Sequence, residues 1–274
     1  MALTRDKMIE AISTGISVPI YKASLANMAA GSLCSLWRAA GSPAWAQGAI
    51  PSTAAVATDD TVGGIALPAF SGKTGRVYRF APACIYSGHF MLFDRLSHRG
   101  GLSGTVTSAQ TVSLDVATAL AAGRCRSDYA DISWFVEVYT DVGTTTSNGT
   151  VSYTDANNTA GKTISISSLF GASPRNRVGT CAPIVPTDGI PIKSIQTITL
   201  SASTGTAGSF GITARKQLCE VGQLLANVCS PLVDAISIGM PEIKETSCLE
   251  MLVLCSTTST GTIFGSLNVG TVLE

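Results

Sequence analysis

The chain has 274 residues and a formal net charge of zero, because 18 Lys and Arg residues balance 18 Asp and Glu residues. Only 13% of the residues are charged while 45% are hydrophobic, which excludes a disordered chain and argues against binding of nucleic acid through the phosphate backbone. Surfaces so poor in charge associate readily, so the composition favours a component of an assembly.

Two helices are predicted near the N-terminus. Residues 4–12 and residues 24–40 repeat apolar side chains at three- and four-residue steps, so that each set shares one helix face. Gly41 followed by Pro43 is a typical stop signal for the second helix. We therefore predict a helical arm over residues 1–41, whose apolar face must be buried against the body or against a partner.

The remainder of the chain divides into a connector and a β-rich body. Residues 42–76 are rich in Ala, Gly, Pro and Ser and show little periodicity, which indicates an extended connector. From residue 77 onward strands dominate, most clearly at 132–140, where Trp134 and Val136 alternate with Phe135 and Glu137.

Three segments of this body follow one plan, a strand, a Ser/Thr/Gly-rich tip and a second strand, which is typical of hairpins. They are residues 137–154, 198–215 and 252–269. The predicted fold class is therefore mainly β: an antiparallel β-sandwich over residues 77–274, jelly-roll-like or immunoglobulin-like, preceded by the helical arm.

The sequence carries no apolar run near the roughly 20 residues that span a bilayer. Its first ten residues, MALTRDKMIE, lack the apolar core of a secretory signal. We expect a chain made in a cytoplasm and without a membrane partner.

Eight cysteines are many for a chain made in a cytoplasm. No pair has the two-residue gap of a zinc knuckle or a redox motif. Two interpretations remain open: small buried apolar residues, or disulfides that form after lysis or export, within or between subunits. The residues are Cys34, Cys84, Cys125, Cys181, Cys219, Cys229, Cys248 and Cys255.

The sequence offers no convincing catalytic or metal-binding pattern. There is no G-x-S-x-G motif, and only two histidines are present. His89 lies within an apolar strand and is interpreted as structural. His98 follows Asp94 by four residues; the pair either tunes a base or joins Arg95 and Arg99 in a hydrogen-bonded polar cluster, and the second interpretation is simpler. We expect no enzymatic activity, no cofactor and no metal.

Several runs of residues carry a resemblance. They are SLWR at 35–38 followed by Gly41, DRLSHRGGLSGTVTSAQTV at 94–112, WFVEVYT at 134–140, VSYT at 151–154 and SIQTITLSASTGTAGSFGIT at 194–213. These runs resemble structural proteins of tailed bacteriophages, of the minor capsid or head-decoration type, over roughly residues 30–215.

The resemblance implies a non-enzymatic virion protein that decorates the capsid surface and stabilises the head shell. Its partners would be other copies of itself, as a homotrimer, and the major capsid protein. Eight cysteines are more than this group is expected to carry, and this departure adds disulfides to other virion proteins as a further expectation. Alternatives are a collar, tail or fibre component, or a module that binds a host surface through the hairpin tips. The tips carry few of the aromatic residues that usually bind sugars, which counts against the last alternative.

Under this resemblance, the apolar face of the second predicted helix is the candidate contact with the capsid shell or with other subunits. Large apolar residues and an Arg are favoured anchors at interfaces. The alternative is that the helix caps its own sandwich. The candidate residues are Leu25, Met28, Leu33, Leu36, Trp37 and Arg38.

Overall fold

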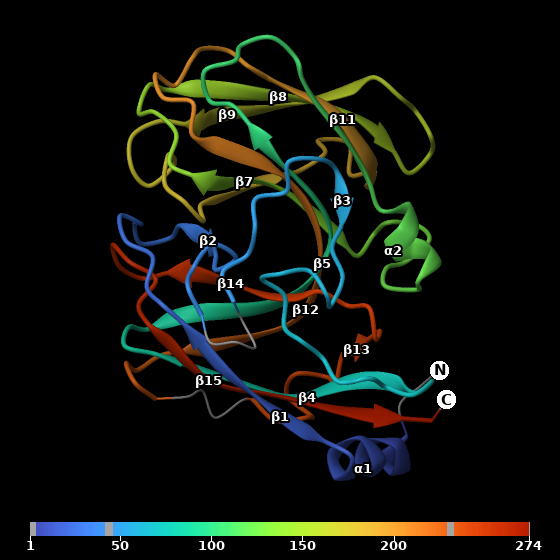
Figure 1. Ribbon diagram of the computed structural model, residues 1–274. Helices are drawn as coiled ribbons and strands as arrows, with labels where there is room; N and C mark the ends of the chain where they lie inside the picture. The colour runs from blue at the N-terminus through green and yellow to red at the C-terminus, as the bar shows by residue number, and fades with distance from the viewer. Residues whose placement is uncertain (1–3, 42–45, 229–232, 274) are drawn as a thin grey trace.

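The computed structural model describes residues 4–41, 46–228 and 233–273, which form a mainly β structure with two short helices. Figure 1 shows the arrangement of these elements, with the two ends of the chain close together beside helix α1. The elements in chain order are α1 (Arg5–Ser13), β1 (Ile16–Lys22), β2 (Leu33–Ser35), β3 (Ala55–Val56), β4 (Thr74–Cys84), β5 (Gly88–Leu102), β6 (Gln110–Asp115), α2 (Ala117–Ala121), β7 (Ile132–Thr140), β8 (Ser147–Asp155), β9 (Lys162–Phe170), β10 (Cys181–Ile184), β11 (Ile192–Leu200), β12 (Ser209–Gln223), β13 (Glu242–Ile243), β14 (Leu249–Cys255) and β15 (Ile263–Val272).

Three antiparallel sheets form two sandwiches that share their middle layer. The central sheet has the order β10-β7-β12-β5-β14-β2, with β3 paired to β5. A four-stranded sheet of order β1-β15-β4-β13 covers one half of it, and a second of order β6-β11-β8-β9 covers the other half. We call the resulting halves the lower and the upper sandwich, as they stand in Figure 1. The predicted antiparallel β-sandwich class is confirmed.

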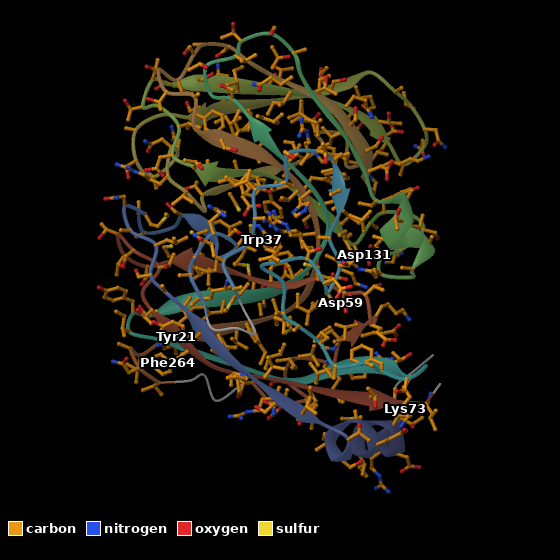
Figure 2. All side chains as sticks on the ribbon, viewed as in Figure 1. Tyr21, Trp37, Asp59, Lys73, Asp131 and Phe264 are labelled. Atoms are coloured by element: carbon orange, nitrogen blue, oxygen red, sulfur yellow. The ribbon has the colours of Figure 1, made fainter. Side chains whose placement is uncertain are left out.

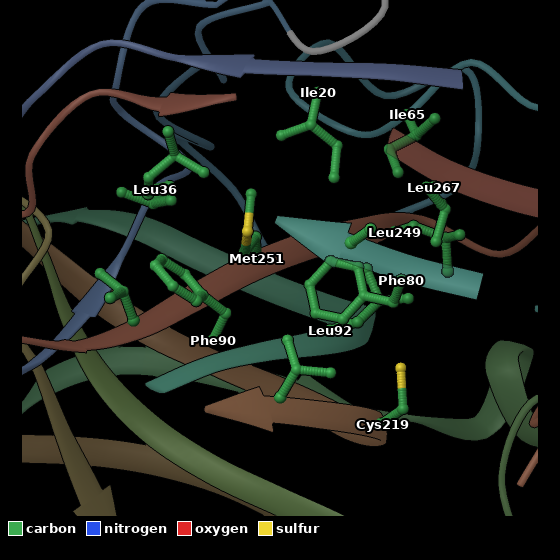
Figure 3. Packing of buried hydrophobic residues seen from close by; sticks show 14 of the residues in the cluster. Ile20, Leu36, Ile65, Phe80, Phe90, Leu92, Cys219, Leu249, Met251 and Leu267 are labelled. Carbon is green, nitrogen blue, oxygen red and sulfur yellow. The ribbon is translucent and has the colours of Figure 1, made fainter. Parts of the chain in front are cut away.

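Each sandwich has its own hydrophobic core. The lower core includes Phe80, Phe90 and Leu267, which Figure 3 shows packed together. The upper core is built around residues such as Val136 and Ile198. The two longest strands, β5 and β12, have 15 residues each and contribute side chains to both cores. The central sheet is therefore the element that makes the two sandwiches one body.

Strand β7 has the predicted bounds, but both of its faces are buried. Trp134 and Val136 enter the upper core as expected. Glu137 and Tyr139, on the other face, are also buried, because Glu137 pairs with two buried arginines and Tyr139 packs in a small cluster with Trp37. The period-2 pattern therefore does not separate a core side from a solvent side here.

The predicted helical arm is wrong beyond its first helix. Helix α1 begins after Thr4, whose side chain accepts a hydrogen bond from the Lys7 amide as an N-cap. Residues 24–40 form no helix and contain strand β2, which pairs with β14. Gly31 and Asn27 adopt positive φ angles of 81° and 63°, and tertiary pairing overrides the helical periodicity.

Residues 1–41 and 42–76 are also not separate units in the parts that the structure describes. Strand β1 is the edge strand of the lower four-stranded sheet, and β2 is an edge strand of the central sheet. Within the predicted connector, β3 pairs with β5, and Ile65 and Phe70 are buried in the lower core. The predicted boundary near residue 77 falls inside strand β4.

The three predicted hairpins have the expected strands but the wrong pairing. The three segments contain the strand pairs β7 and β8, β11 and β12, and β14 and β15. In each pair one strand belongs to the central sheet and the other to an outer sheet, so the tip crosses between layers. The strands stack face to face because both must bury a core face. The first two tips do meet: the Thr145 amide donates to the Thr204 carbonyl over 3.1 Å. The third tip, residues 256–262, lies in the lower sandwich.

None of the helices in the described ranges is long and apolar enough to cross a membrane.

Helix α1 lies so close to β15 that a methyl group at Gly270 has no room. A Cβ there would lie 1.7 Å from the carbonyl oxygen of Ala11, whereas a Cβ at Gly222 would have its nearest neighbour, Nδ1 of His89, at 3.7 Å. We expect Gly270→Ala to lower the free energy of unfolding by about 1–3 kcal/mol through overpacking, measured by urea denaturation. Gly222→Ala is the matched control and should cost less than about 1 kcal/mol. Equal losses in the two variants would contradict the predicted contact.

Candidate functional site: a buried charge network between the two sandwiches

Four charged side chains form a closed ring in the central sheet. They are Arg95 on β5, Arg215 on β12, Glu137 on β7 and Glu250 on β14, each at most 1% exposed. Arg95 lies 2.8 Å from Glu137 and 2.9 Å from Glu250, Arg215 lies 2.7 Å from Glu137, and Arg215 Nε donates to Glu250.

The strand register explains why both carboxylates are needed. Arg215 stands directly opposite Arg95 in the β12–β5 pairing. Two guanidinium groups at facing positions repel each other in a low-dielectric interior. Glu137 and Glu250 come from the strands on either side and each accepts from both arginines. The ring therefore ties four adjacent strands, in the order β7-β12-β5-β14.

Aromatic and polar side chains make the remaining contacts of the Arg95 guanidinium. The guanidinium carbon of Arg95 lies 4.2 Å from the centroid of the Trp37 ring. Its Nη2 donates a hydrogen bond to Tyr139 Oη over 2.6 Å. Arg95 Nε donates to Nδ1 of His98 over 2.9 Å, so this nitrogen carries no proton and the imidazole is neutral. Figure 2 shows Trp37 between the two sandwiches.

A second buried ion pair extends the network toward the surface loops. Arg124 pairs with Asp94, and it also donates to the backbone carbonyls of Ala57 and Arg95. Asp94 accepts in addition from the Ser247 hydroxyl over 2.9 Å. Three arginines thus face three carboxylates, and the network as a whole is neutral.

The network lowers the pKa of Glu137 and of His98. Burial by itself raises the pKa of Glu137, but Arg95 and Arg215 outweigh it and hold that pKa at about 2. Burial, followed by the nearby charge of Arg95, lowers the pKa of His98 to about 3. Burial by itself lowers the pKa of Arg215, but the carboxylates of Glu250 and Glu137 outweigh it and raise that pKa above its ordinary value. Glu137 is therefore ionised and His98 neutral near neutral pH, and the ring is closed to solvent. Its chemistry is that of a structural connection.

The sequence predicted part of this network. The polar cluster of Asp94, Arg95 and His98 is present, but Asp94 pairs with Arg124 and not with His98. The other members were missed. Their signal is a single charge inside an apolar strand, as in ISWFVEVYT around Glu137 and LEMLVLC around Glu250.

The remaining polar candidates are ordinary surface or turn residues. His89 pairs with Glu220 at 3.2 Å on the partly exposed part of the central sheet. Asp128 pairs with Arg126, and Asp131 accepts from the Arg126 amide. Among residues 4–41, 46–228 and 233–273, no group of three or more His, Cys, Asp or Glu side chains is placed to hold a metal ion.

The six predicted contact residues do not share one exposed face. Met28, Leu36 and Trp37 are at most 3% exposed and Leu25 and Leu33 are packed against buried clusters. Arg38 donates to the Gly48 carbonyl. The helix that would have presented these side chains is absent, so the prediction of an apolar arm face is wrong and the alternative, that this segment covers its own body, describes them.

All seven described cysteines are buried free thiols, as the first interpretation expected for most of them: Cys34, Cys84, Cys125, Cys181, Cys219, Cys248 and Cys255. Cys229 lies outside the described residues. Disulfides within or between subunits stay a prediction.

Exposed apolar side chains gather on the lower sandwich. In the described part of the chain, 13 of the 16 exposed large hydrophobic residues lie on its strands, its helix or its loops. They are Ile9, Ile12, Ile16, Tyr21, Ile85, Tyr86, Leu224, Leu225, Val228, Ile236, Leu254, Phe264 and Leu273. Tyr21 and Phe264 face each other across β1 and β15, with 47% and 40% of their surfaces exposed, and Figure 2 shows them side by side.

No protein-family model and no curated protein matches this sequence. Among solved structures, the chain is weakly similar to a pilus subunit of Bacillus endospore appendages, at 18% identity over 49% of this chain and 95% of that chain, with a TM-score of 0.21. It is also weakly similar to the VP2 subviral particle of infectious bursal disease virus, at 10% identity over 95% of this chain and 81% of that chain, with a TM-score of 0.20. Likenesses at this level carry no argument about fold or function.

Removal of one carboxylate from the ring leaves two buried arginines without sufficient negative charge. We expect Glu137→Gln to lower the free energy of unfolding by about 3–5 kcal/mol, measured by urea denaturation near pH 7. Glu220→Gln, which removes an exposed carboxylate paired with His89, should change it by less than about 1 kcal/mol. A Glu137→Gln protein as stable as its control would show that the ring is not needed.

Acid should destabilise the protein in two stages. His98 has a folded pKa of about 3 and an ordinary value of 6.5, and Glu137 has a folded pKa of about 2 and an ordinary value of 4.5. The unfolded chain binds more protons than the folded chain at both residues. The contribution of His98 to the free energy of unfolding is therefore fully present above about pH 6.5 and is lost as the pH falls toward 3, and the contribution of Glu137 is lost between about pH 4.5 and 2. The urea midpoint measured across this range should decrease continuously. His98→Asn should flatten the decrease between about pH 6.5 and 4.5, and an unchanged profile in this variant would contradict the assignment.

Proposed function

We propose that the chain is a non-enzymatic structural protein of a tailed-bacteriophage virion, which binds the head shell through the apolar surface of its lower sandwich. Two lines support this proposal. One is the resemblance of its sequence to minor capsid and decoration proteins of these phages. The other, which carries the proposal, is the concentration of exposed apolar side chains on one sandwich of a chain with zero net charge.

The surface argument follows from solvation. Large exposed apolar side chains are common singly, but their accumulation on one part of a protein is typical of a binding surface. The upper sandwich has the same architecture and the same β content, yet it exposes Thr and Ser in place of large apolar residues, for example Thr150 and Ser165 on β8 and β9. The difference is therefore one of surface chemistry and not of fold.

The buried network suits such a role. A shell protein must resist deformation, and the ring of Arg95, Arg215, Glu137 and Glu250 holds four strands of the central sheet in one register. Contacts made at the lower sandwich would pass to the upper sandwich through β5 and β12, which run through both. The partners in this proposal are further copies of the chain and the major capsid protein.

The location is tested by quantitative mass spectrometry of purified particles, with heads and tails separated. The proposal expects a copy number in the head fraction comparable with that of the major capsid protein. A few copies confined to the neck or tail fraction would replace it with the collar, tail or fibre alternative. Absence from both fractions would overturn the virion proposal.

The surface is tested by binding of variants to heads that lack the protein. Tyr21→Ser combined with Phe264→Ser should weaken binding by about tenfold or more, because truncated apolar anchors cost at least about 1.4 kcal/mol. The matched control is Val106→Ser combined with Val185→Ser, which removes exposed apolar side chains outside the lower sandwich. Circular dichroism of both variants establishes that they are folded. Equal binding by the two variants would overturn the lower sandwich as the contact.

A further inference from the structure

Two cysteines meet on one face of the central sheet, at the pairing of the short edge strand β2 with β14. Cys34 on β2 stands opposite Val253 on β14, and Cys255 lies two residues further along the same strand. Alternate residues of a strand point to the same face, so Cys34 and Cys255 are diagonal neighbours on one face. Both belong to the lower core, at 0% and 4% exposure.

The Cys34 thiol donates to the Ser35 carbonyl over 3.6 Å. Its interaction with the thiol of Cys255 raises the pKa of Cys34 and lowers the pKa of Cys255. Backbone hydrogen bonds fix the position of Cys255, since its amide donates to the Ser32 carbonyl over 2.9 Å and its carbonyl accepts from the Gly31 amide over 2.8 Å. The sulfurs are therefore held together by the strand pairing itself.

The other thiol of this region has a different partner. Cys84 also belongs to the lower core, but its thiol donates to the Thr260 carbonyl over 3.2 Å and its sulfur accepts from the Tyr86 amide. Cys219 lies in the same core, at the position labelled in Figure 3, on strand β12. Of the cysteines in the lower core, Cys34 and Cys255 are the pair in mutual contact.

We propose that Cys34 and Cys255 form an intrachain disulfide when the protein meets a low-molecular-weight disulfide of the glutathione type. The Cys255 thiolate attacks one sulfur of that disulfide, forms a mixed disulfide and releases one thiolate. The Cys34 thiolate then attacks the sulfur of Cys255, and the second small thiolate leaves. Two protein thiols are oxidised, one small disulfide is reduced to two small thiols, and the two protons of the protein thiols end on these small thiols.

The fold allows the small movement that this bond needs. Diagonal neighbours lie roughly 7–8 Å apart, beyond the roughly 6.8 Å that a disulfide spans between Cα atoms, so β2 must approach β14 by about 1 Å. β2 has three residues and lies at the edge of the sheet, next to Gly31 with its φ of 81°. The bond would close a loop of roughly 220 residues and so constrain the unfolded chain strongly. It would tie the N-terminal segment to the C-terminal strands after the protein leaves a reducing cytoplasm.

The test uses the isolated full-length chain and does not depend on the virion proposal. The reduced protein is incubated with oxidised glutathione, its remaining thiols are alkylated, and linked peptides are mapped by mass spectrometry. We expect a Cys34–Cys255 linked peptide, a monomer on non-reducing gels, and a melting temperature raised by about 5–10 °C. Dithiothreitol should reverse the shift.

Variants distinguish this pair from the others. The shift on oxidation should be absent in Cys34→Ala and in Cys255→Ala, and it should persist in Cys84→Ala and in Cys219→Ala. A Cys84–Cys255 linked peptide, a disulfide between chains, or oxidation without any Cys34–Cys255 peptide in the wild-type protein would each overturn the assignment. The wild-type peptide map decides even where a variant fails to fold.

Discussion

Two arginines that face each other on neighbouring strands are the constraint around which this fold is arranged. Arg95 and Arg215 are fully buried at paired positions of β5 and β12. They can remain there only because β7 and β14 bring Glu137 and Glu250 to either side. Along the four strands from β7 to β14 the charges are therefore negative, positive, positive and negative. Trp37 and Tyr139 enclose Arg95, so that water does not reach the ring.

The value of such a ring lies in the specification of register more than in net stability. Desolvation of buried charges costs several kcal/mol per ion, and well-packed apolar residues often give equal stability. A slip of β12 by one residue, however, would move Arg215 to the opposite face and leave both carboxylates with a single partner. β5 and β12 need this control because their pairing already contains several register shifts, one of them between Ala214 and Arg215. Apolar side chains at these positions would tolerate a pairing of β12 with β5 shifted by one residue, whereas the buried charges exclude it.

The sequence predicted what depends on local periodicity and missed what depends on long-range pairing. The bounds of β7 and the position of α1 follow from the alternation and from the helical spacing of apolar residues, which are local properties. The three predicted hairpins contain real strands, but the two strands of each segment belong to different sheets. Which strands pair depends on partner strands that lie elsewhere in the chain, so the segment alone does not determine it. Residues 24–40 show the same limit, because the pairing of Cys34 with Val253 joins segments separated by more than 200 residues. The candidate site was found in part through Asp94 and His98, since they are close in sequence, whereas Glu137, Arg215 and Glu250 converge from three distant strands.

The network also determines how the two sandwiches can act on each other. Their main cores are separate clusters. The connections between them include β5, β12, the charges at the middle of these strands, and a small apolar cluster of Phe93, Phe135, Cys181 and Leu252. The ring resists bending of the sheet at this point, because any splaying of the strands leaves an unpaired charge in a low-dielectric interior. The same junction should yield in acid, when His98 and then Glu137 take up protons. At neutral pH the ring therefore couples the two sandwiches through the strands that they share.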